Sequence, residues 1–126
     1  MKYLKFMQNV AFALLVGGVA PSLWADEFAD GFMAAVKGDY KEALSTWKPL
    51  ANNGHPDAQF NLALILHSGA SGALDEKEAV KLYHKAAENG NYNAQQYLAA
   101  AYGEGWFGLK KDPKQATYWL NKLSER

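Results

Sequence analysis

From residue 26 onward, apolar residues recur at the three- and four-residue spacing of amphipathic helices, separated by short polar or glycine-containing stretches. The pattern is also repetitive. The segment 57–64 (DAQFNLAL) aligns with 93–100 (NAQQYLAA) at an offset of 36 residues, and further downstream Asp75 aligns with Asp112 at an offset of 37. A repeat of this length indicates stacked helix pairs, with one extra residue in the loop of the second repeat.

Capping residues support the same register. An aspartate followed three residues later by Glu or Gln opens three of the predicted helices: Asp39 with Glu42, Asp75 with Glu78, and Asp112 with Gln115. Such pairs bond the free amide groups at a helix start, and Gly54 and Gly90 provide left-handed helix ends. We therefore expect an all-α fold, a short α-solenoid of about three stacked antiparallel helix pairs. The expected pairs are 27–37 with 40–53, 57–68 with 76–89, and 93–103 with 113–124.

Small and large residues alternate at matching positions of the two aligned copies. The first copy carries Ala58, Leu62, Ala63, Leu66, Gly69, Asp75, Ala79, Tyr83, Ala86, Ala87 and Gly90, and the second carries Ala94, Leu98, Ala99, Tyr102, Gly105, Asp112, Ala116 and Trp119. This pattern resembles the Sel1-like repeat family, a branch of the tetratricopeptide-repeat superfamily. The chain departs from the family pattern at residues 63 and 99, where alanine replaces glycine, and in the ending of its last unit. The resemblance implies the solenoid fold and a role in binding other proteins.

The first 25 residues have the three parts of a secretory signal peptide. Lys2 and Lys5 form a positive start, an uncharged apolar run covers residues 10–20, and the segment ends in the small residue Ala25. The run is shorter than the roughly 20 residues of a membrane-spanning helix, which disfavours the alternative of a retained anchor. We expect cleavage after Ala25, a mature repeat domain of residues 26–126, and a periplasmic or secreted location.

Composition narrows the function classes. The chain has 13 basic and 13 acidic residues and no cysteine, so no net field favours nucleic acid and thiolate chemistry is excluded. Five of the 13 carboxylates are assigned to helix caps, and His55, His67 and His84 do not have the spacing of a metal site. We therefore expect no catalytic residue, metal or cofactor, and an envelope hydrolase is the least favoured function.

The resemblance also places the first helix of each pair on the concave face of the solenoid, where a peptide or helix of another protein would bind. The candidate groove residues are Asp57, Phe60, Leu64, His67, Asn93 and Gln96, flanked by Phe28, Phe32 and Ala100. For Phe60 and Leu64, a place in the core is an equally weighted alternative. Trp106 and Phe107 lie in a loop that either contacts the partner or folds back over the open end of the last layer, and we favour the second.

The last helix pair has no polar capping helix after it, although solenoids usually need one. We therefore expect Trp119, Leu120 or Leu123 to be exposed, which would suit a partner or a homodimer contact. A frayed, solvated end is the alternative. For the chain as a whole, we expect an adaptor for another protein whose identity the sequence does not reveal. The alternative function is an immunity-type or inhibitor protein that binds one toxin or enzyme.

Overall fold

The computed structural model describes residues 25–72 and 74–125, which form six α-helices and no strand. The helices are α3 (Ala25–Val36), α4 (Tyr40–Asn52), α5 (Pro56–Ser68), α6 (Glu76–Glu88), α7 (Tyr92–Glu104) and α8 (Pro113–Ser124). Their ends differ from the predicted ones by no more than two residues, and the all-α fold is confirmed. Apart from Ala25, the expected signal peptide (residues 1–25) lies outside the described residues, so its cleavage stays a prediction.

The predicted aspartate caps form at three helix starts. In each, a carboxylate accepts a hydrogen bond from the backbone N–H three residues later over 3.0–3.2 Å: Asp39 from Glu42, Asp75 from Glu78, and Asp112 from Gln115. Two further caps were not predicted, and they lie 36 residues apart. Nδ1 of His55 accepts from the N–H of Ala58 at 3.1 Å, and Oδ1 of Asn91 accepts from the N–H of Ala94 at 2.8 Å. The repeat therefore includes the caps of α5 and α7, although their side chains differ.

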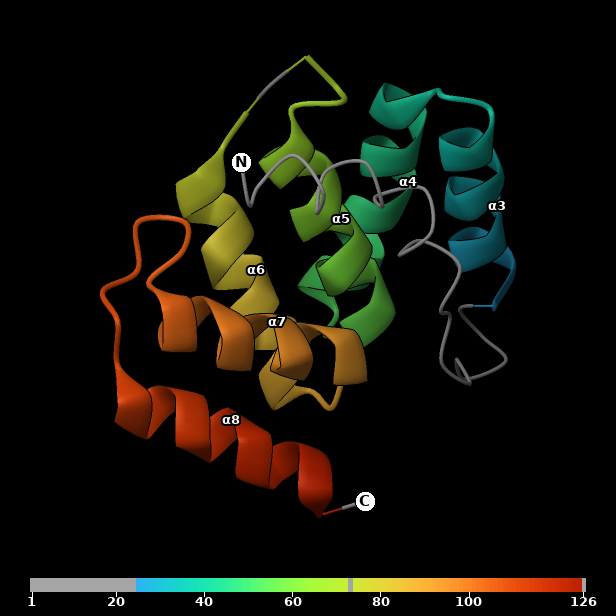
Figure 1. Cartoon of the computed structure of the whole chain (residues 1–126). Helices are drawn as coiled ribbons and strands as arrows, with labels where there is room; N and C mark the ends of the chain where they lie inside the picture. The colour runs from blue at the N-terminus through green and yellow to red at the C-terminus, as the bar shows by residue number, and fades with distance from the viewer. Residues whose placement is uncertain (1–24, 73, 126) are drawn as a thin grey trace.

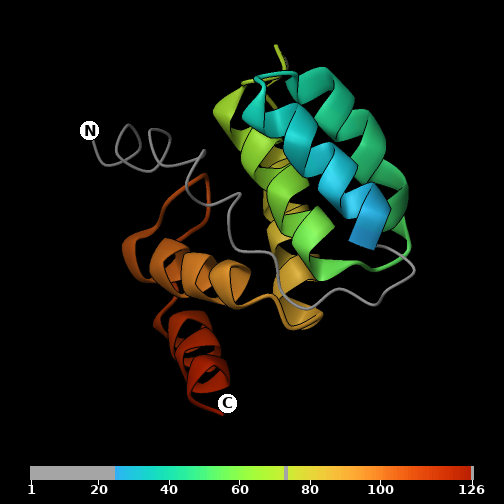
Figure 2. The same ribbon diagram turned by 90° about the vertical axis from the view of Figure 1, so that its right-hand side faces the viewer.

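Each helix packs against the next one along the chain. The helices α3 to α6 lie side by side with alternating direction, so α4 and α6 run the same way, and α7 and α8 lie across the end of this group (Figure 1). The turned view shows the same change of direction after α6 (Figure 2). Within residues 25–72 and 74–125, no helix combines the length and apolar character needed to span a membrane.

Small residues let the helices approach, and large rings fill the spaces between them. The fully buried alanines include Ala43, Ala63 and Ala79. Trp47 and Tyr83, 36 residues apart, are also fully buried. A Cβ atom at Gly31 would collide with the Trp47 ring, so the contact of α3 with α4 requires glycine there. The indole N–H of Trp47 donates to the carbonyl of Phe28 at 3.1 Å, which fixes α3 on α4.

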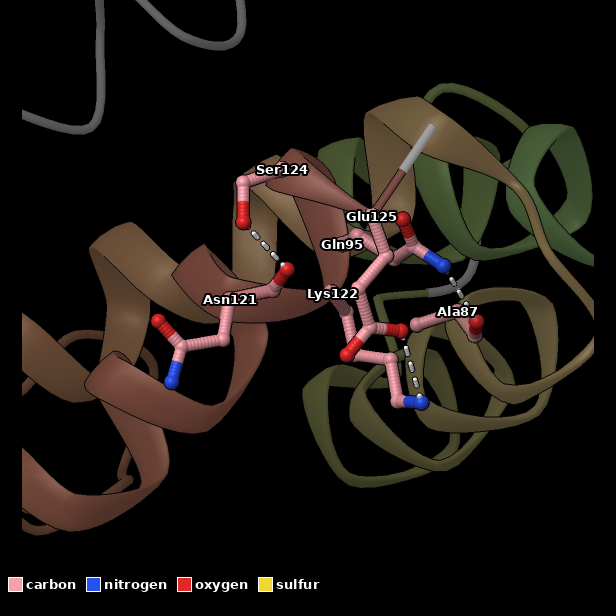
Figure 3. A network of polar contacts seen from close by, with 6 residues as sticks. All are labelled: Ala87, Gln95, Asn121, Lys122, Ser124 and Glu125. Atoms are coloured by element: carbon pink, nitrogen blue, oxygen red, sulfur yellow. Dashed lines mark hydrogen bonds and ion pairs between the residues drawn. The ribbon is translucent and has the colours of Figure 1, made fainter.

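Two buried glutamines make the same bond in successive repeats. Nε2 of Gln59 donates to the carbonyl of Ala51, and Nε2 of Gln95 donates to the carbonyl of Ala87, both at 3.0 Å. Figure 3 shows the second of these bonds. Each bond ties the first helix of one pair to the last turn of the preceding pair, so the glutamines connect neighbouring layers of the solenoid.

The last helix exposes one of the three apolar residues that the sequence offered for exposure. Trp119 is not that residue, because it is buried, with its ring 6.2 Å from the ring of His84. Leu123 is half-buried, and only Leu120 is largely exposed, at 56%. A homodimer contact through this layer stays a prediction.

Candidate protein-interaction surface

The predicted groove residues on α5 are buried. Phe60, Leu64 and His67 expose only 4%, 1% and 3% of their surface. Phe60 and Leu64 belong to the hydrophobic core, which is the alternative that the sequence left open. Asp57 is also buried, and its carboxylate accepts a 2.8 Å hydrogen bond from the side chain of Asn91 at the start of α7. These four side chains hold helices together, and their direct contact with a partner stays a prediction that their burial disfavours.

His67 lies in a buried aromatic cluster with Tyr83, Tyr97 and Phe107. Its Nδ1 is 3.2 Å from the Tyr83 hydroxyl, and its ring meets Phe107 edge-on with centroids 3.9 Å apart. Tyr97 stacks on Tyr83 at 3.7 Å and on Phe107 at 5.2 Å. Burial lowers the pKa of His67 to about 4 and raises the pKa of Tyr83. His67 is therefore neutral at pH 7, and the cluster joins α5, α6, α7 and the loop that follows.

The loop between α7 and α8 folds onto this aromatic cluster. Phe107 is buried at a φ of 57°, a left-handed conformation that costs a non-glycine residue about 1–2 kcal/mol. Its packing against the rings of His67 and Tyr97 offsets that cost. Trp106 is half-buried and lies edge-on to Phe107 at 6.0 Å. The loop thus folds back, and Phe107 covers the aromatic cluster between α5 and α7.

The exposed part of the predicted groove lies on α7. Gln96 and Ala100 are exposed and Asn93 is half-buried. Tyr92 is 43% exposed, and Nε2 of Gln96 donates to its hydroxyl at 3.2 Å. Because residues four apart share one face of a helix, these side chains form one patch, here called the α7 surface (Tyr92, Asn93, Gln96 and Ala100). Sequence reasoning missed Tyr92, although its place four residues before Gln96 could have identified it.

The other histidines serve the fold. His55 caps α5, and Nε2 of His84 is 3.0 Å from the hydroxyl of Tyr102. Burial lowers the pKa of both histidines, against the opposing effect of Asp57 on His55 and of Glu88 on His84. In the part of the chain that the structure describes, no three or more His, Cys, Asp or Glu side chains come close enough to hold a metal ion.

The α7 surface presents an aromatic ring, a hydroxyl, two amides and a methyl group. These groups suit contact with another protein, because tyrosine contributes apolar area and a hydrogen bond at the same place and is enriched at interfaces. The surface contains no charged side chain. Recognition there would therefore depend on shape and neutral hydrogen bonds.

Comparisons with known proteins agree with this architecture. The chain is 31% identical over 81 residues to chitin synthase regulatory factor 2 of Schizosaccharomyces pombe, an alignment that covers 64% of this chain and 16% of that relative. No solved structure matches the chain. The model of the Sel1 repeat matches residues 56–91 and 93–126, which contain the pairs α5–α6 and α7–α8. Because these matches cover more than half of its length, the chain belongs to the Sel1 repeat family.

Proposed function

We propose that the chain is an exported, non-catalytic adaptor that binds another protein through the α7 surface. The two Sel1 repeats support this most directly, because such repeats mediate protein–protein interaction. The S. pombe relative is named as a regulatory factor of an enzyme, and the shared segment is a small part of it. Protein binding is therefore inferred for this chain from its Sel1 repeats.

The α7 surface is favoured over the buried α5 residues for a physical reason. A partner can reach Gln96 and Ala100 without any rearrangement of the core, because both are exposed. Contact with Phe60 or Leu64 would first require their core packing to open. Three helix pairs make a short surface, so its affinity for a partner should be modest.

Export rests on the charged start, apolar run and small exit residue within positions 1–25. Mass spectrometry of the protein isolated from its native host tests this part. We expect a mature N-terminus at Asp26. A protein that keeps residues 1–25 would contradict export by a cleaved signal peptide.

Affinity capture from an envelope or secreted fraction tests the binding surface. A Gln96→Arg variant places a long charged side chain on the α7 surface and should lose the captured partner. The matched control is Thr117→Arg, an equally solvent-facing position on α8, which should retain it. A partner held equally by both variants would show that the α7 surface is not the contact.

A further inference from the structure

A second surface lies between α4 and α6. A cavity of about 410 Å³ opens there, and its floor is apolar. Leu62 and Leu66 of α5 contribute to this floor together with Leu82 of α6. No residue of the α7 surface lines this cavity, so it is a separate feature of the fold.

The charged residues on the rim of this cavity are separated by sign, with acidic side chains at one end and basic side chains at the other. Asp75 and Glu78 line it at the start of α6, whereas Lys85 lies near the end of that helix. Because α4 and α6 run in the same direction, Lys48 of α4 lies toward the basic end. Within the described residues, neither lysine forms an ion pair, and Glu78 pairs with the exposed Lys81 at 3.7 Å. Along α6, the surface therefore reads acidic, apolar, basic.

The outer face of α3 has the same order of charges along its chain direction. Asp30 is exposed, Met33 is 51% exposed, and Lys37 is exposed just beyond the end of the helix. The N–H of Lys37 still donates to the carbonyl of Met33 at 3.2 Å, so the helical spacing continues to that residue. Neither Asp30 nor Lys37 forms an ion pair within the described residues. Along α3, this face therefore reads acidic, apolar, basic from its N-terminal end.

The two surfaces match residue by residue when the helices are antiparallel. On α3, Met33 follows Asp30 by three residues and precedes Lys37 by four. On α6, Leu82 precedes Lys85 by three residues and follows Glu78 by four. Each charged pair thus spans seven residues, a rise of about 10.5 Å along an α-helix.

We propose that the cavity between α4 and α6 binds α3 of a second copy of this chain. Met33 of the second copy enters the cavity, because a long, unbranched thioether side chain fills irregular apolar gaps. Its Asp30 lies on Lys85 and its Lys37 lies on Glu78. The contact uses no residue of the α7 surface, so self-association does not depend on the proposed adaptor function.

Sedimentation of the purified protein over a range of concentrations at low salt tests the proposal. The wild-type chain should show an average mass that rises above the monomer mass with concentration. Reversal of one charge, by Asp30→Lys or by Lys85→Glu, should weaken association at least about tenfold, because like charges then face each other across the contact. The double variant carries both reversals and should regain association, since the pair is restored with exchanged signs.

The controls separate a direct contact from a general effect. Lys114→Glu on α8 changes the net charge as much as Lys85→Glu but lies outside both surfaces, so it should associate like the wild type. Circular dichroism of each variant checks that the helices persist. Wild-type protein that stays monomeric at every concentration overturns the proposal, and so does a double variant that associates no better than the single ones. Neither result affects capture of a different protein by the α7 surface.

Discussion

Replacing His67 with glutamine should reduce the loss of stability that acid causes. Burial holds the pKa of His67 at about 4 in the folded chain, whereas a solvated histidine titrates near 6.5. Between these two pH values, the unfolded chain binds a proton that the folded chain does not. The free energy of unfolding therefore falls as the pH decreases from 6.5 toward 4, and this contribution is complete below pH 4.

The size of this change in the free energy of unfolding follows from the difference between the folded and unfolded pKa values of His67. At about 1.4 kcal/mol for each pKa unit, His67 alone lowers the free energy of unfolding by up to about 3 kcal/mol between pH 7 and pH 4. Glutamine keeps a polar group near the Tyr83 hydroxyl, which His67 contacts at 3.2 Å, but it does not titrate.

Urea unfolding at pH 7, 6, 5 and 4 provides the assay. Carboxylates also titrate in this range, so the informative quantity is the difference between the wild type and His67→Gln at each pH. This difference should shrink or reverse sign as the pH falls, since the wild type alone loses the His67 contribution. His84→Gln is the control. His84 is only half-buried, and Glu88 opposes the lowering of its pKa, so this variant should change the pH dependence less than His67→Gln does. A difference that stays constant from pH 7 to pH 4 would show that the pKa of His67 is not lowered in the folded chain.

Three further substitutions test the packing. Phe60→Ala should lower the free energy of unfolding by about 3–5 kcal/mol, because the ring is 4% exposed in the core; preserved stability with lost binding would place Phe60 in a partner groove after all. Ala79→Leu should cost about 1–3 kcal/mol through overpacking, since Ala79 is fully buried, and unchanged thermal unfolding would mean that α6 packs in another register. Gln95→Leu should cost about 0.5–1.5 kcal/mol by removing the hydrogen bond to Ala87, and a neutral result in urea unfolding would show that this bond does not stabilise the stack.

The helix pairs and their aspartate caps could be predicted because both leave local patterns in the sequence. The cap at Asp75 needs only an acceptor and an amide three residues later, and the structure contains that bond at 3.0 Å. Matching alanines such as Ala43 and Ala79 indicate the repeat, and both are fully buried. Local sequence patterns therefore predict where these helices start and which of their faces carry small residues.

The burial of α5 could not be predicted from periodicity. Every residue from Asp57 to Ile65 is buried, so this helix has no polar face to separate groove from core. An apolar residue such as Leu64 fits the sequence pattern equally well in a partner groove and in the core. The loop could not be predicted for a similar reason, because the burial of Phe107 depends partly on the ring of His67, which lies on α5 and is distant in sequence. The N-caps His55 and Asn91 were missed because their residue types differ between the repeats.

We expect the exposed face of α7 to contact a protein partner in the cell. Site-specific photo-crosslinking in the native host tests this contact, with a photoreactive residue at position 96 in one strain and at position 117 in another. Position 96 should give a discrete crosslinked protein and position 117 should give none. Crosslinking from position 117 alone, or from neither position in a folded protein, would contradict a role of the α7 surface in binding.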